Sequence, residues 1–117
     1  MAKTKNKNLL TKDEIIEKIK AEKDYLILNF HLTEIGLFGS YVRGQQKKKS
    51  DIDILIDYDH EIGISLFEMM DLSEYLSDIF GKKVDLALKR TLKPVIGHYV
   101  LNEVVYIWKL KGKLMTW

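Results

Sequence analysis

Hydrophobic and polar positions repeat with two different periods along this chain, and the two periods predict helices and strands in turn. From Thr11 to Leu28, apolar residues recur at roughly helical period after a Thr and a Glu three residues apart, which is the spacing of a capping box. This stretch is predicted to be one helix. A second helical repeat fills 64–80 and stops at Gly81, and a third begins near Pro94. The second repeat places these residues on one face, with the two methionines expected in the core: Leu66, Met69, Met70, Ser73, Leu76 and Phe80.

Four shorter apolar runs have the composition of strands. They cover Glu34–Phe38, Ser50–Tyr58, Lys82–Lys89 and Val104–Trp108, and after the first there is room for only a helical turn or two. Helices and strands therefore alternate along the chain. This order predicts one α/β or α+β domain, in which a mixed or partly parallel sheet of about four strands is flanked by helices.

Length and composition support a single core and narrow the function classes. Of the 117 residues, 46% are hydrophobic and 31% are charged, which suits one layered domain. Residues 1–10 are expected to be a flexible, basic lead-in, and residues 11–117 the domain. The net charge of +2 gives no strong argument for binding nucleic acid or an anionic membrane. Cysteine is absent and no apolar run approaches membrane-spanning length, so a cytoplasmic location is expected.

Two acids stand one residue apart at the start of the second predicted strand. Because side chains on a strand alternate between faces, Asp51 and Asp53 point the same way and their carboxylates repel each other. Protonation of one acid, open water or a bound cation could relieve this repulsion, and hard oxygen ligands favour Mg²⁺. A third acid, Asp85, points away from the apolar face of the next strand. The alternative without a functional role is a set of solvent-exposed acids on an edge strand.

The segment before these acids carries groups that bind phosphate. Gly39 follows a buried strand and lets the backbone turn sharply, while Ser40 and Arg43 share one face of the next helical turn. The N–H groups of the helix start, the Ser40 hydroxyl and the Arg43 guanidinium would together hold a triphosphate against a metal on Asp51 and Asp53. Singly, each of these residues also fits a structural role, as a turn glycine, a helix cap or a surface cation.

The sequence GSYVRG, followed by SDID and by an isolated acid in the third strand, resembles the minimal nucleotidyltransferases of the DNA polymerase β-like superfamily. The resemblance covers roughly Ile35 to Trp108 and implies a single-domain nucleotidyltransferase fold. Val42 departs slightly from the pattern, because the family usually has alanine there. The family pattern falls on Gly39, Ser40, Arg43, Gly44, Ser50, Asp51, Asp53 and Asp85.

The resemblance also implies a mechanism. Asp51 and Asp53 would ligate two Mg²⁺ ions, while Asp85 would complete one metal site and favour deprotonation of an acceptor hydroxyl. The acceptor would attack the α-phosphate of ATP in line, and pyrophosphate would leave. The residues that would bind the nucleotide are Gly39, Ser40, Arg43 and Ser50.

Small stand-alone members of this family resemble the antitoxin half of toxin–antitoxin pairs, in which the partner is a helical HEPN-type ribonuclease. The resemblance implies transfer of AMP from ATP to a hydroxyl of that toxin, with tyrosine as the expected acceptor. Two other functions stay open. One is a binding module that neutralises its partner by contact alone; the other is a transferase acting on RNA or a small molecule, favoured only by the basic run Lys47–Lys49.

Other residues that could carry chemistry have weaker patterns. His31, His60 and His98 lie far apart without metal-ligand spacing and are expected to be surface or packing residues. The C-terminal tail ending at Trp117 alternates basic and apolar residues, and it could pack within the fold or dock on a partner.

Overall fold

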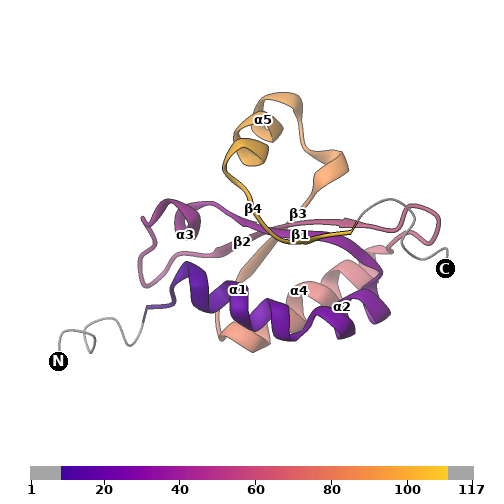
Figure 1. Ribbon diagram of the computed structural model, residues 1–117, viewed down its shortest axis with the longest axis horizontal. Coiled ribbons are helices and arrows are strands. Elements are labelled where there is room, and N and C mark those ends of the chain that lie inside the picture. Colours follow the sequence, from indigo (N-terminus) through magenta and orange to yellow (C-terminus); the bar gives the residue numbers. More distant parts are fainter. Residues whose placement is uncertain (1–8, 111–117) are drawn as a thin grey trace.

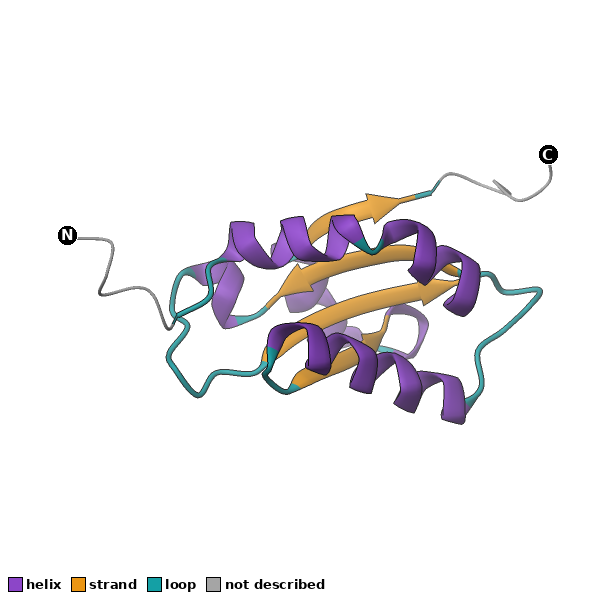
Figure 2. Ribbon diagram, turned by 90° about the horizontal axis from the view of Figure 1, so that it is seen from below, coloured by secondary structure: helices purple, strands orange, loops and turns teal. Residues whose placement is uncertain are grey.

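The computed structural model describes residues 9–110, which form a four-stranded sheet with helices on both faces (Figures 1 and 2). The order of strands across the sheet is β3-β2-β1-β4. The strands are β1 (Leu32–Phe38), β2 (Ile52–Tyr58), β3 (Val84–Leu88) and β4 (Val105–Lys109). The helices are α1 (Lys12–Ala21), α2 (Lys23–Phe30), α3 (Ser40–Arg43), α4 (Leu66–Phe80) and α5 (Pro94–Glu103), with a 3-10 turn, η2, at Lys89–Thr91.

The two faces of the sheet are covered unequally. Helices α1, α2 and α4 lie on one face, whereas α5 lies alone on the other (Figure 1). Seen from below, α1 and α2 follow one another along the sheet, with α4 beside them (Figure 2). The short α3 lies at one end of the sheet (Figure 1).

The register of the strands brings three strand ends together. β1 and β2 run antiparallel and pair Phe38 with Asp53, while β2 and β3 run parallel and pair Asp53 with Asp85. β4 runs antiparallel to the other side of β1. The C-terminal end of β1 therefore lies beside the N-terminal ends of β2 and β3. The predicted mixed sheet of four strands is confirmed, as is the alternation of helices and strands after Leu32.

The hydrophobic core lies between the sheet and the three helices α1, α2 and α4, whose side of the sheet is called the three-helix face below. Ile52, Ile54 and Ile56 of β2 are fully buried there, together with Ile15 and Ile19 of α1. Isoleucine stands at every second position of β2, and because every second residue of a strand points the same way, these side chains share one face. Each such buried side chain stabilises the fold by roughly 1.5–3 kcal/mol relative to an exposed one.

The first predicted helix is wrong in one respect, because it is two helices. The chain leaves helical geometry at Glu22, where φ is −100° and ψ is 9°. The break is short, since the Glu22 N–H still bonds to Ile19 and the Glu22 carbonyl accepts from Leu26. Ile19, Leu26 and Phe30 all face the core on either side of it. The apolar period runs through the break unchanged, so the pattern could not reveal it.

The buried face of α4 also differs from the predicted one. Leu72 and Leu76 are fully buried, but Leu66 and Met70 are 73% and 59% exposed. The expected core position of Met70 is therefore wrong. Spacings of three and four residues fit two adjoining faces of a helix, and only the docking of α4 on the sheet decides which face is buried.

Two expectations fall wholly or partly outside the described residues. The basic lead-in was placed at 1–10, of which 1–8 are not described, and the tail that ends at Trp117 is not described beyond residue 110. Among the helices of residues 9–110, none is long and apolar enough to cross a membrane.

Candidate active site at one end of the sheet

The three acids selected from the sequence meet where β1 ends and β2 and β3 begin. Asp51 directly precedes β2, Asp53 is the second residue of β2, and Asp85 is the second residue of β3. Asp53 and Asp85 are register partners on neighbouring strands, which lie about 4.8 Å apart in a sheet. The structure therefore places the three acids side by side at one end of the sheet.

The surroundings of Asp53 disfavour its charged form. Burial raises the pKa of the Asp53 carboxyl above its ordinary value of 3.8, Asp85 and Asp51 raise it further, and Arg43 opposes them. Lys83 compensates the outer acids, since its Nζ lies 3.6 Å from Asp85 Oδ1 and 4.0 Å from Asp51 Oδ2. An added cation beside Asp53 would offset both its burial and its repulsion by Asp85 and Asp51.

Gly39 forms the turn on which the Asp53 carboxylate rests. Its φ of 84° is a conformation that favours glycine, and a Cβ built on it would overlap Asp53 Oδ2. The nearest side chain to this glycine is therefore that of Asp53 itself. The contact fixes where the Asp53 carboxylate can point.

A glutamate that the sequence analysis did not select ties this turn to Arg43. Glu103, the last residue of α5, accepts a hydrogen bond on Oε2 from the Gly39 N–H at 2.7 Å. Arg43 Nη1 lies 2.9 Å from Glu103 Oε1 and 3.1 Å from Oε2, while Arg43 Nε donates to Gln45 at 3.0 Å. Glu103 and Arg43 are 60 residues apart, so no local pattern could have joined them.

The two serines of the pattern have different surroundings. Ser40 opens α3, where its carbonyl accepts from the N–H groups of Gly44 and Gln45. Within residues 9–110 the Ser40 hydroxyl has no hydrogen-bond partner, so it is available to a ligand. Ser50 Oγ accepts from the backbone N–H of Lys47 at 2.8 Å and closes the basic loop before β2. Its expected part in nucleotide binding stays a prediction.

An open pocket of about 580 Å³ lies between Asp53 and α5. Ile96 and Tyr99 of α5 form an apolar wall of this pocket and are 56% and 70% exposed. Large apolar side chains on an open wall are suited to contact a bound molecule. The residues that line the pocket are Phe38, Gly39, Arg43, Asp53, Ile96, Tyr99, Val100 and Glu103.

The carboxylate oxygens at this site suit a cation that takes its remaining ligands from water and substrate. Among residues 9–110, no group of three or more His, Cys, Asp or Glu side chains is arranged as a complete metal site. Mg²⁺ needs no such cage, because one or two carboxylates commonly hold it while water and substrate phosphates supply the remaining oxygens. The carboxylates of Asp51 and Asp53 fit that chemistry, because burial and then the neighbouring acids raise the pKa of Asp53 and a cation would offset both effects.

The histidines take no part in this site. His31 ends α2 in the left-handed conformation, with φ of 58°. His60 lies 3.5 Å from Asp57, and His98 lies 3.1 Å from Asn102 on the same helix. His60 and His98 thus have local partners, and His31 forms the end of a helix.

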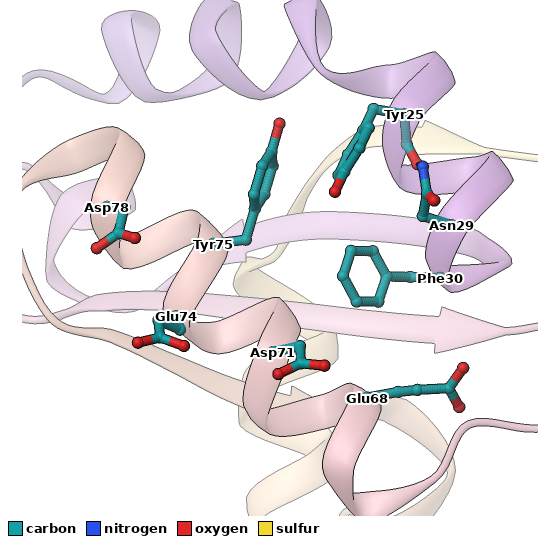
Figure 3. Close-up of a pocket in the computed structure, with 8 residues that line it drawn as sticks. All are labelled: Tyr25, Asn29, Phe30, Glu68, Asp71, Glu74, Tyr75 and Asp78. Atoms are coloured by element: carbon teal, nitrogen blue, oxygen red, sulfur yellow. The ribbon is translucent and has the colours of Figure 1, made fainter.

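A second pocket, of about 490 Å³, lies between α2 and α4 on the three-helix face (Figure 3). The rings of Tyr25 and Tyr75 stack across it with centroids 4.7 Å apart. The Tyr75 hydroxyl donates to Glu22, a hydrogen bond that raises the pKa of Tyr75 to about 12. Acidic side chains follow α4 along this pocket, so the surface is negative and aromatic. The residues that line it are Tyr25, Asn29, Phe30, Glu68, Asp71, Glu74, Tyr75 and Asp78.

Comparison with known proteins identifies the family of the chain. The family described as "Polymerase beta, Nucleotidyltransferase" matches residues 17–111. A Thermococcus cleftensis protein named "Protein adenylyltransferase MntA" is 48% identical over 99 residues, which cover 85% of this chain and 98% of that protein.

Two solved structures share the fold. One, described as a toxin–antitoxin crystal structure with AMP-PNP, has a TM-score of 0.68 and 28% identity, covering 82% of this chain and 74% of the other. The second, a mutant form of the toxin–antitoxin pair MntA-HpeT, has a TM-score of 0.64 and 26% identity, covering 80% and 74%. The family match spans most of the chain and includes the turn, the acids and α5. The chain therefore belongs to the polymerase β family of nucleotidyltransferases.

Proposed function

We propose that this nucleotidyltransferase transfers AMP from ATP to a hydroxyl of a partner protein, in a reaction that requires Mg²⁺. The observation that carries the proposal is the meeting of Asp51, Asp53 and Asp85 beside the Gly39 turn. The name of the Thermococcus relative supports AMP as the group and a protein as the acceptor. The AMP-PNP in the name of the similar structure supports an adenine nucleotide as the donor.

The acids would divide the chemistry between them. Asp51 and Asp53 would hold two Mg²⁺ ions and Asp85 would complete one site, and the bound metal would supply charge stabilisation at the attacking and departing oxygens. The Asp85 carboxylate would accept the proton of the acceptor hydroxyl. The hydroxyl oxygen then forms a bond to the α-phosphorus as the bond to the bridging oxygen breaks, and pyrophosphate leaves.

The turn before β2 would orient the phosphates. The Gly39 N–H, the Ser40 hydroxyl and the Arg43 guanidinium all donate hydrogen bonds, which is the chemistry that phosphate oxygens need. Ser50 would act with them from the start of β2. The apolar wall of Ile96 and Tyr99 would border the space where nucleotide and acceptor meet.

The partner in this proposal is a toxin, and the chain is its antitoxin. Two structures with more than 25% identity are described as toxin–antitoxin complexes. The family resemblance adds that the toxin is a HEPN-type ribonuclease and that tyrosine is the acceptor. A cytoplasmic location, where ATP and Mg²⁺ are plentiful, belongs to the same proposal.

Transfer of label from [α-³²P]ATP to the purified partner toxin tests the proposal. Wild type with Mg²⁺ should label the toxin, and EDTA or Asp53→Asn should reduce labelling by at least about a hundredfold, because the reaction loses a metal ligand. Asp24→Asn, the same change at an exposed position of α2, should label as wild type does. Equal labelling by Asp53→Asn would show that these acids do not carry the transfer.

A second candidate function is neutralisation of the toxin by contact alone, and the surface of α4 favours it. No basic side chain of residues 9–110 forms an ion pair with Asp71, Glu74 or Asp78, and Phe67 and Met70 of the same helix are exposed. Such a surface complements a basic protein surface with apolar residues between its charges. Full neutralisation by an Asp51→Asn/Asp53→Asn protein would favour this candidate, whereas failure of that variant would favour transfer.

A further inference from the structure

We propose that the Glu103 carboxylate is a positioning residue that occupies the phosphate-binding groups of the free enzyme and yields them to the nucleotide. The inference rests on the proposed function, since it takes the Gly39 N–H and Arg43 as donors to the nucleotide phosphates. The Glu103 carboxylate competes with the nucleotide phosphates for those donors, and this competition lowers the affinity for the nucleotide.

The contacts of Glu103 have the form of an anion bound in a phosphate site. One oxygen accepts from the Gly39 N–H at 2.7 Å, and both oxygens lie within 3.1 Å of Arg43 Nη1. A carboxylate that receives a backbone N–H and a guanidinium N–H presents oxygens much as a phosphate would. A phosphate oxygen and Glu103 therefore cannot take these hydrogen bonds at the same time.

The position of Glu103 makes exchange with a ligand feasible. Its side chain is 25% exposed and that of Arg43 is 49% exposed, so both reach solvent. Glu103 also lines the same pocket as Asp53 and Tyr99, so a nucleotide that enters this pocket meets the carboxylate directly. Ion pairs between partly exposed groups are weak, and a more highly charged triphosphate can displace the carboxylate from them.

Displacement of Glu103 would also remove a contact between α5 and the turn that follows β1. Glu103 is also the last residue of α5, and its hydrogen bond to Gly39 fixes that end of the helix to the β1 turn. The carboxylate thus links the state of the phosphate site to the wall formed by α5.

Isothermal titration of the full chain with AMP-PNP and Mg²⁺ tests the inference. Glu103→Gln keeps the shape and the acceptor for the Gly39 N–H but removes the competing charge, so the dissociation constant should fall about tenfold. Glu103→Asp keeps the charge on a stem one methylene shorter, and should lower the dissociation constant by a smaller factor. Glu17→Gln, the same change at an exposed position of α1, should bind as wild type does.

The possible outcomes separate the two proposals. If wild type binds tightly and Glu103→Gln binds equally well or more weakly, the carboxylate only holds the turn. That result would overturn the inference but leave the proposed function intact. No binding by wild type would overturn both. In transfer assays the variant should lower the KM for ATP more than it changes kcat, a split that a purely structural tie would not produce. If Glu103→Gln does not fold, Glu103→Asp supports the same comparison.

Discussion

Gly39 lies so close to the Asp53 carboxylate that a side chain on Gly39 would have no room. The glycine has a backbone conformation that other residues rarely adopt, and its Cα faces the Asp53 carboxylate. The carboxylate in turn is partly buried against the turn and repelled by Asp85 and Asp51. At the scale of single residues, the site therefore combines close packing with electrostatic repulsion, and each of the two can be measured separately.

Replacing Gly39 by alanine tests the packing. Both Gly39 and Gly44 have positive φ, of 84° and 72°, but a Cβ at Gly44 would have no atom within 4 Å. Gly44→Ala should therefore lower the free energy of unfolding by about 1 kcal/mol, from backbone strain alone. Gly39→Ala should lower it by about 2–4 kcal/mol and abolish transfer, because Asp53 must also move. Urea unfolding of both variants measures the difference, and equal losses would mean that the contact with Asp53 is unimportant.

Replacing Asp53 by asparagine tests the combined cost of burying this carboxylate and of its repulsion by Asp85 and Asp51. The folded protein raises the pKa of Asp53 above 3.8, so folding favours the protonated form and works against the carboxylate. Stability from protonated Asp53 is fully present below the unfolded pKa and is lost as pH rises through the folded pKa. At pH 7, in EDTA, Asp53→Asn should therefore unfold with a free energy higher by up to about 1 kcal/mol.

This advantage of Asp53→Asn should disappear as the pH approaches 3.8, because wild-type Asp53 is then neutral as well. Asp24→Asn, on the exposed side of α2, is the control for the change of side chain. Thermal unfolding of the three proteins over a range of pH gives the comparison. A lower stability of Asp53→Asn at pH 7 would mean that the carboxylate is held by favourable contacts rather than repelled.

The ends of the helices follow local chemistry closely. Thr11 and Glu14 form the capping box expected at the start of α1, Gly81 ends α4 with a φ of 64°, and Pro94 is in the first turn of α5. These features depend on a few neighbouring residues, which is why the sequence could predict them. The break between α1 and α2 at Glu22 has no proline, glycine or capping residue to mark it, so at the scale of elements the sequence pattern could not predict it.

A second capping box gives a test at this scale. Ser65 Oγ accepts from the Glu68 N–H at 3.1 Å, and Glu68 accepts from the Ser65 N–H at 2.8 Å. Ser65→Ala should lower the free energy of unfolding by about 1 kcal/mol, because the helix start loses a hydrogen-bond acceptor. Ser65→Asp keeps a cap and should stay close to wild type. Denaturant midpoints compare the three proteins, and an unchanged midpoint for Ser65→Ala would argue against the capping box.

At the scale of the whole molecule, the sheet explains which parts of the site the sequence could predict. The acids could be selected because strand alternation and the family pattern both act over a few residues, and the register of three strands then unites Asp53 with Asp85. Glu103 and the wall of Ile96 and Tyr99 could not be selected in this way, because only the crossing of α5 over the sheet brings them to the acids.

The arrangement of layers also separates two surfaces that could act on a partner. Asp53 lines the pocket beside α5, whereas the α2–α4 pocket lies between helices that cover the opposite face of the sheet (Figures 1 and 3). A partner modified at the first surface need not be held at the second. Chemistry and contact inhibition can therefore be separated by substitutions in different layers.

The central claim is that the acids at the end of the sheet attach AMP to a partner protein. Intact-mass spectrometry of the partner that co-purifies with this chain from its host tests that claim most directly. With wild type, the partner should be heavier by about 329 Da for each adenylyl group, the mass of AMP less water. With Asp53→Asn, the partner should have its unmodified mass. A partner that is bound but unmodified with both proteins would contradict the claim and favour inhibition by contact.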